Sequence, residues 1–112
     1  MKIAGLILIG LLCYWNTFDV PFVFDDMAAV VHNQTLLRSG SFDLASMRGL
    51  LFTTFRWNYQ LGELSVCGYH AFNLALHVLN GILVFFIAKS IFATVSRYGS
   101  TPAFLAAVFF IV

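Results

Sequence analysis

Residues 69–92 read YHAFNLALHVLNGILVFFIAKSIF, and this stretch decides the fold class. It contains 24 residues and a single formal charge, Lys89, near its end. A helix of about 20 apolar residues crosses the hydrocarbon layer of a bilayer. The aliphatic stem of a lysine near a helix end lets its ammonium group reach the polar interface. The stretch therefore predicts a membrane-spanning helix over residues 69–92.

The composition of the whole chain also indicates a membrane protein. It is 61% hydrophobic and 10% charged, with a mean hydropathy of +0.90, whereas soluble domains average about 45–50% apolar and about 25% charged residues. The net charge is +1, and without a basic patch to neutralise phosphates the sequence excludes nucleic acid as a partner. Cys13 and Cys67 lack metal-ligand spacing, and we expect them to be buried, unreactive thiols.

Two further apolar runs flank this stretch. Residues 3–18 follow Lys2 without a charge, and we expect a first span rather than a signal peptide, because no small cleavage residues follow. Residues 102–112 begin a third run that is too short to cross a bilayer. We therefore expect a fragment, with the remaining polypeptide or partner helices covering the third span. The predicted fold is an all-α membrane protein with two transmembrane helices and a truncated third.

Residues 19–68 form a mixed segment between the first two spans. It holds all five acidic residues of the chain and three arginines. Lys2, Lys89 and Arg97 lie near the ends of the spans, and positive charges favour the cytoplasmic side. The segment 19–68 is therefore predicted to be an extracytoplasmic loop of a multi-pass protein.

Helices and turns are also predicted inside and beside this loop. Asp26 is expected to cap a short helix over 27–31, residues 38–41 to form a turn, and 93–101 a polar loop. Asn33-Gln34-Thr35 matches a glycosylation sequon. Helical spacing predicts an amphipathic helix lying in the membrane interface, with the apolar residues Leu44, Met47, Leu51 and Phe55.

Four polar residues of the 69–92 stretch share one helix face: His70, Asn73, His77 and Asn80. At 100° per residue they fall within an arc of about 80°. Polar groups inside a membrane face the protein interior or a wet cavity. They could line a substrate site, but hydrogen bonding between helices is the favoured interpretation. The two histidines lie two turns apart, which disfavours a zinc site.

Asp25 and Asp26 follow the apolar run 20–24, close to the end of the predicted first span. Carboxylates at a bilayer edge are costly to desolvate, so the pair could be catalytic, bind a cation or cap the next helix. On a helix the two side chains diverge by about 100°. Only one of them is expected to enter any one site, while the other can cap, and the residues alone favour capping.

A series of short motifs resembles a known family. Pro21-Phe22-Val23-Phe24-Asp25-Asp26, then Val30-Val31 and Asn33, resembles the first extracytoplasmic loop of membrane O-mannosyltransferases that carry tetratricopeptide repeats. Further similarities follow in order at Arg48-Gly49-Leu50-Leu51-Phe52, Asn58-Tyr59, Leu61-Gly62, Gly68-Tyr69-His70, Asn73 and Leu76-His77. The resemblance covers residues 14–88. Gly49 stands where the family usually has proline.

The resemblance implies a GT-C type glycosyltransferase that uses a polyprenyl-phosphate sugar. Such enzymes transfer the sugar, here expected to be mannose, to a Ser or Thr hydroxyl of an acceptor protein with inversion. It implies Asp25 as the catalytic base and Asp26 as a supporting residue. Substrate contacts are expected at Arg48, His70, Asn73 and His77, with no metal and no cofactor beyond the lipid-linked donor. The short loop looks more like bacterial members, and residues 1–112 alone are expected to be inactive.

A non-enzymatic protein is the rival hypothesis. A small integral membrane protein could serve as a subunit or assembly partner of a larger complex. It would dock on another helix through the polar face of 69–92. We rank a transporter fragment below both, because the predicted spans contain no carboxylate.

Overall fold

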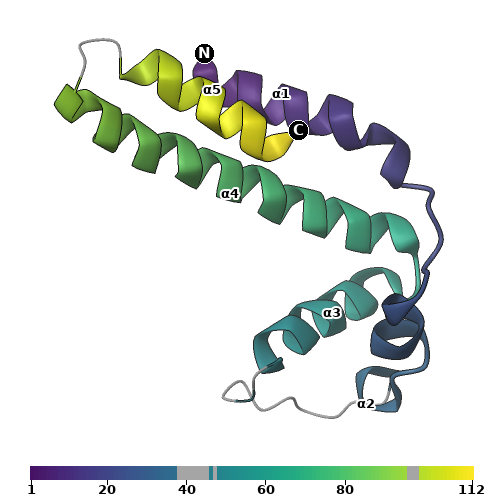
Figure 1. Ribbon diagram of the computed structural model, residues 1–112. Coiled ribbons are helices and arrows are strands. Elements are labelled where there is room, and N and C mark those ends of the chain that lie inside the picture. Colours follow the sequence, from purple (N-terminus) through teal and green to yellow (C-terminus); the bar gives the residue numbers. More distant parts are fainter. Residues whose placement is uncertain (38–45, 47, 96–98) are drawn as a thin grey trace. The chain divides into compact units, whose positions relative to one another are not determined.

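The computed structural model describes residues 1–37, 46, 48–95 and 99–112 (Figure 1). Every regular element within these ranges is a helix, which confirms the all-α prediction. The chain divides into two compact units. Unit 1 comprises Met1–Asn16 and Asn73–Val112, and unit 2 comprises Thr17–Phe72.

One helix of the described residues is long and apolar enough to cross a membrane. Helix α4 runs over Val66–Val95, and an 18-residue window within Val66–Thr94 has a mean hydropathy of 2.0. At about 1.5 Å per residue, a helix of 30 residues exceeds the roughly 30 Å of bilayer hydrocarbon. The predicted span at 69–92 therefore coincides with a helix of sufficient length and composition.

The other two apolar runs are helical but shorter. Helix α1 covers Lys2–Tyr14 and continues as the 3₁₀ turn η1, Trp15–Thr17. Helix α5 covers Ser100–Ile111. Both fall below the length required of a membrane span, so the predicted first span and truncated third span are not confirmed.

The polar loop expected at 93–101 is shorter than predicted. Helix α4 continues to Val95, and α5 already begins at Ser100. Arg97 lies outside the described residues. The polar residues in this stretch were mistaken for loop, but helix ends tolerate hydroxyl side chains: the Thr94 hydroxyl donates to the carbonyl of Ile91 at 2.6 Å.

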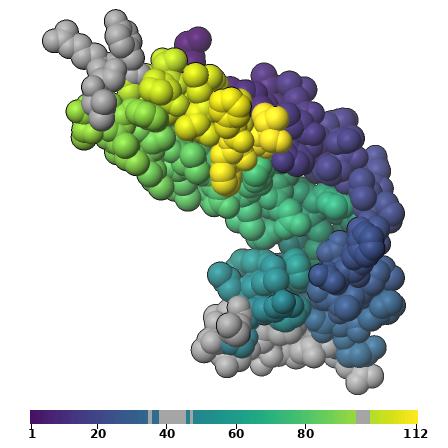
Figure 2. All heavy atoms as spheres, in the orientation of Figure 1, coloured from purple at the N-terminus to yellow at the C-terminus, as the bar shows by residue number. Residues whose placement is uncertain are grey.

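Small residues bring the helices of unit 1 together. Ala103 and Ala107 of α5 are fully buried, together with Leu6 of α1 and Ile111 of α5. Lys2 Nζ donates to the hydroxyl of Ser100 at 3.0 Å. This bond joins the first turns of α1 and α5, and further along the helices Gly5 faces Phe104 and Gly10 faces Ile111, so the two helices run in the same direction. In Figure 2 their atoms lie directly against each other.

Two glycines make this close approach possible. A Cβ atom at Gly10 would lie 2.6 Å from Val78 Cγ2, and one at Gly81 would lie 2.5 Å from Ile111 Cδ1. Real carbon atoms do not approach so closely, so either substitution forces a neighbour to move. Helices in membranes use small residues in the same way to bring their backbones together.

Unit 2 is built around a second buried cluster of Val30, Leu36 and Tyr69. It contains the π-helical turn η2 (Met27–Val31), the short helix α2 (Gln34–Leu37), helix α3 (Gly49–Gly62) and the first residues of α4. Phe22, Ala29 and Phe55 pack against the cluster. The unit thus joins the segment before Asp25 to the start of α4 through side chains.

The expected amphipathic helix has a different apolar face from the predicted one. Phe55 of α3 turns inward onto the buried cluster, Leu51 is exposed, and Leu44 and Met47 lie outside the described residues. Three other apolar side chains are exposed on α3: Leu50 (71% exposed), Trp57 (59%) and Leu61 (89%). We call these three residues the outer face of α3. At 100° per residue they fall within an arc of about 40°.

Both cysteines are exposed, which contradicts the expectation that they are buried. Cys13 lies near the end of α1 and Cys67 in the first turn of α4. Both helices carry apolar side chains on several faces. In such a helix an apolar neighbourhood in the sequence does not indicate that a residue is covered by protein.

Replacing Gly10 with leucine should destabilise unit 1. The new side chain would collide with Val78, and overpacking of this kind costs about 1–3 kcal/mol. Thermal unfolding of the purified protein in detergent, followed by circular dichroism, measures the loss. Ala4→Leu is the matched control, because Ala4 is exposed on the same helix. Equal melting temperatures for the two variants would contradict the proposed close packing.

Candidate functional site

Asp25 and Asp26 open a helical turn that leads into η2. The N–H of Asp26 donates to the carbonyl of Val23 at 3.0 Å, and the N–H of Met27 donates to that of Phe24 at 3.2 Å. We call residues 23–27 the acidic turn. Asp25 is exposed and Asp26 is half-buried. The two carboxylates therefore have different environments, because adjacent side chains on a helical turn point in directions about 100° apart.

The acidic turn contains an unusual backbone conformation at Phe24. Its φ is +48°, in the left-handed region that residues with a bulky side chain rarely adopt. The Phe24 side chain is 90% exposed, so its own packing does not stabilise this conformation. The surrounding chain must therefore hold it.

Asp26 stands at the N-cap position of η2, as predicted, but its side chain makes no capping hydrogen bond. The residue already has helical φ and ψ angles of −63° and −32°. A capping side chain needs an extended backbone to reach the N–H groups of the next turn. The expected capping role of Asp26 is therefore not realised in the structure.

Asn33 provides the capping bond that Asp26 lacks, one helix later. Its Oδ1 accepts from the N–H of Leu36 at 3.1 Å, and its Nδ2 donates to the carbonyl of Ala29 at 3.0 Å. The side chain thus links η2 to α2. Because both amide atoms are engaged and the residue is half-buried, Asn33 has a structural role that its sequon did not indicate.

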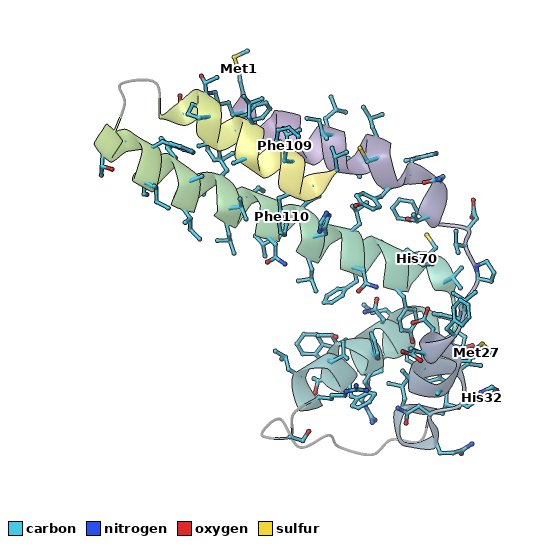
Figure 3. The ribbon with its side chains drawn as sticks, in the orientation of Figure 1. Met1, Met27, His32, His70, Phe109 and Phe110 are labelled. Carbon is cyan, nitrogen blue, oxygen red and sulfur yellow. The ribbon has the colours of Figure 1, made fainter. Side chains whose placement is uncertain are left out.

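Two neighbouring residues of α4 hold the segment that precedes the acidic turn. The Nε2–H of His70 donates to the carbonyl of Val20 at 2.9 Å. The ring of Phe22 meets that of Tyr69 edge to face, with centroids 5.2 Å apart at 84°. Figure 3 labels His70 on α4 and Met27 at the start of η2. Residues 20 and 22 are therefore both attached to the N-terminal part of α4.

Tyr69 is itself firmly placed, although sequence reasoning gave it no role. It is 4% exposed, and its hydroxyl lies within hydrogen-bonding distance of the carbonyls of Glu63 (3.2 Å) and Phe55 (3.4 Å). Phe55 lies in the middle of α3, and Glu63 is the residue after its end. The Gly68-Tyr69-His70 motif could have indicated this role, because it places a large aromatic residue near the start of an apolar helix.

His77 also contacts neighbouring helices. Its Nε2–H donates to the carbonyl of Ile111 in α5 at 3.1 Å. The ring lies edge to face with Tyr14 (5.4 Å) and stacks on Phe110 (5.3 Å). This is the hydrogen bonding between helices that the sequence favoured for the polar residues of α4.

The two asparagines of the polar face differ from the histidines. Asn73 and Asn80 are exposed, whereas His70 and His77 are half-buried. In helical projection the histidines form one edge of the arc and the asparagines the other, about 40–80° apart. The predicted stripe is thus two pairs with different surroundings, and the histidines form hydrogen bonds of 2.9 and 3.1 Å to backbone carbonyls elsewhere in the chain.

Arg48 precedes α3 and has an exposed side chain. Gly49, the residue that replaces the family's proline, occupies the first helical position. Proline is favoured at this position, because the first N–H of a helix has no partner within it. Here the N–H of Gly49 donates to the carbonyl of Ser46 at 3.1 Å instead. The helix therefore begins at Gly49 without the proline.

Metal binding has no support among the side chains that the structure describes. Within those residues no three His, Cys, Asp or Glu side chains lie close enough together to hold an ion. The histidines of the polar face each donate a ring N–H to a backbone carbonyl instead. Among the described residues, the carboxylates of the acidic turn therefore have no further His, Cys, Asp or Glu side chains beside them that would complete a metal site.

Comparison with known proteins identifies relatives of one kind. The chain is 31% identical over 94 residues to protein O-mannosyl-transferase TMTC3 of Homo sapiens, which covers 69% of this chain. It is 32% identical over 120 residues to Tmtc1 of Drosophila melanogaster, covering 90%, and 30% identical over 109 residues to TMTC4 of Mus musculus, covering 81%. No family model and no solved structure matches.

The chain spans only 10% of the length of human TMTC3, 14% of Drosophila Tmtc1 and 15% of mouse TMTC4. These relatives come from animals, and the predicted preference for a bacterial membrane stays a prediction. All three relatives carry the name protein O-mannosyl-transferase, which agrees with the family indicated by the acidic turn and the Gly68-Tyr69-His70 motif. The chain therefore contains a TMTC-like protein O-mannosyl-transferase region.

Proposed function

We propose that this chain is part of a membrane enzyme that transfers mannose from a polyprenyl-phosphate donor to Ser or Thr hydroxyls of proteins. The observation that carries the proposal is the similarity to protein O-mannosyl-transferases over 69–90% of the chain. The exposed carboxylate of Asp25, at a defined helical turn, supplies the chemistry that such a transfer requires.

The reaction needs one base and stabilisation of one leaving group. The hydroxyl oxygen of the acceptor forms a bond to the anomeric carbon of the sugar on the face opposite the phosphate. The bond between that carbon and the phosphate oxygen breaks, and the phosphate leaves with the electron pair. In this proposal Asp25 takes the proton of the hydroxyl. Phosphate is a good leaving group, so no general acid is required.

The remaining predicted site residues have supporting roles in the proposal. Asp26, half-buried beside Asp25, orients the turn or the acceptor. The exposed guanidinium of Arg48 is suited to a phosphate oxygen, because its planar donors match that geometry. Asn73 has an exposed amide that can bind a sugar hydroxyl. The substrate contacts expected at His70 and His77 stay predictions.

We also propose the membrane topology that the reaction requires. Helices α1 with η1 and α4 would cross the membrane, α5 would begin a third span, and residues 19–68 would form the extracytoplasmic loop. Support comes from the many exposed apolar side chains of α1 and α4, which suit a lipid environment. Because three residues separate α3 from α4, the end of α3 would lie at the membrane surface.

Replacing Asp25 with asparagine in the full-length protein should abolish transfer. The amide cannot accept the hydroxyl proton, and loss of a general base costs roughly 10²–10⁴-fold in rate. The measurement is incorporation of labelled mannose into an acceptor peptide, with membrane insertion assayed in parallel. Asp19→Asn, at an exposed aspartate outside the acidic turn, should retain activity. An active Asp25→Asn enzyme would refute the assignment of the base.

The outer face of α3 should contact lipid at the bilayer surface. A spin label at Leu61→Cys would then collide more often with oxygen, which partitions into lipid, than a label at Gln60→Cys. The two positions are adjacent and both exposed, but they point about 100° apart. Electron paramagnetic resonance in vesicles, with Cys13 and Cys67 replaced by serine, makes the comparison. Equal oxygen accessibility at both positions would argue against the interfacial placement.

The non-enzymatic alternative is favoured by one observation, the exposure of Asn73 and Asn80 on a helix suited to a membrane. Exposed amides on such a helix can bind a partner helix, at about 0.6–2 kcal/mol per bond. If this alternative is right, Asn73→Leu with Asn80→Leu should abolish complex formation, measured by crosslinking in native membranes. Asp25→Asn and Asp26→Asn would then have no effect on the assembly.

A further inference from the structure

We propose that His70 and Tyr69 are positioning residues for the acidic turn. They hold residues 20 and 22 on the N-terminal part of α4 and thereby set the direction in which Asp25 presents its carboxylate. This inference rests on the proposed function, in which Asp25 is the base. It assigns His70 a contact within the protein in place of a contact with substrate.

The two contacts are of different kinds and act on neighbouring residues. His70 donates its Nε2–H to the carbonyl of Val20 at 2.9 Å, and because a carbonyl only accepts, Nε2 must carry the proton. Tyr69 receives the edge-to-face contact of Phe22, whose centroid lies 5.2 Å away. A polar bond and an aromatic contact thus attach both ends of a three-residue segment to one helical turn.

The acidic turn depends on such an attachment because of Phe24. Its φ of +48° is unfavourable for a residue with a Cβ atom, and its side chain is 90% exposed. Such conformations persist only where the surrounding structure determines them. Only Val23 lies between Phe22 and Phe24, so the contact at Tyr69 acts almost directly on the strained residue.

The attachment point is rigid on the side of α4. Tyr69 is 4% exposed, it packs in one cluster with Val30 and Leu36, and its hydroxyl lies 3.2 Å from the carbonyl of Glu63. Val30 belongs to η2, the element that the acidic turn enters. Residues before and after Asp25 are therefore both fixed to Tyr69, and the turn between them has few ways to reorient.

A glutamine at position 70 separates a positioning role from a chemical one. Its amide N–H can donate to the Val20 carbonyl at a similar reach, but it cannot exchange a proton as an imidazole does. Phenylalanine keeps a ring but removes the donor. His32→Phe is the matched control, because His32 is exposed in the same unit and no substrate role is assigned to it.

The first readout reports conformation and needs no activity. A spin label is placed at Val23→Cys in the full-length protein, with the other cysteines, Cys13 and Cys67 among them, replaced by serine. We expect greater label mobility in His70→Phe, and unchanged mobility in His70→Gln and His32→Phe. Unchanged mobility in His70→Phe would overturn the proposal, whatever the activity of the protein.

The second readout is the transfer reaction. One neutral hydrogen bond corresponds to roughly a two- to tenfold change in the population that it favours. We expect kcat to fall by roughly this factor in His70→Phe, the KM for the donor to stay unchanged, and His70→Gln to restore the rate. A His70→Gln enzyme as impaired as His70→Phe, with normal label mobility, would overturn the proposal and indicate a substrate contact.

The two readouts separate this inference from the proposed function. If the full-length protein transfers no mannose but the label at Val23 responds as expected, the attachment of the acidic turn stands and the enzymatic assignment fails. If transfer requires Asp25 but the label does not respond to His70→Phe, the enzymatic assignment stands and the positioning role is refuted.

Discussion

The contacts of Tyr69 are the interaction on which unit 2 depends. Its ring meets Phe22 edge to face and packs with Val30 and Leu36, while its hydroxyl reaches the carbonyl of Glu63 at 3.2 Å. Segments before and after the acidic turn, and the end of α3, thus converge on one side chain. An aromatic residue with a polar tip suits this position, because it fills apolar space and still satisfies a backbone acceptor.

Unit 1 is stabilised by a different principle. Its buried residues include Ala103 and Ala107 of α5, and Gly10 and Gly81 leave no room for a Cβ atom. Large side chains such as Leu8, Leu83 and Phe109 are instead exposed. Large apolar residues thus lie on the outer surface as well as in the buried cluster, where Leu6, Phe85 and Ile111 accompany the small residues. This arrangement is stable where lipid covers the outer surface and backbones approach closely.

The sequence predicted which segments are helical better than it predicted which side of each helix is buried. The apolar run 69–92 lies within α4, because a long uninterrupted apolar stretch favours a helix wherever it packs. On the predicted face of α3, Leu51 is exposed but Phe55 is not directed outward. Phe55 and Trp57 look equally suited to lipid in the sequence. Which of them turns inward depends on Tyr69, 14 residues beyond Phe55 in the chain. The sequence also did not distinguish the role of His70 from that of Asn73. Helical projection places both on one arc of about 80°, but it does not show which of them contacts another segment of the chain.

The same reasoning explains why an acidic pair is a weak site prediction by itself. Asp25 and Asp26 are adjacent, yet one is exposed and the other half-buried, and the expected cap is absent because Asp26 is already helical. A base must be held in line with the hydroxyl that it deprotonates, and misplacement reduces the rate steeply. The identity of the carboxylate is therefore only part of the site. The strained backbone of Phe24 and the contacts of Val20 and Phe22 with α4 decide where that carboxylate points.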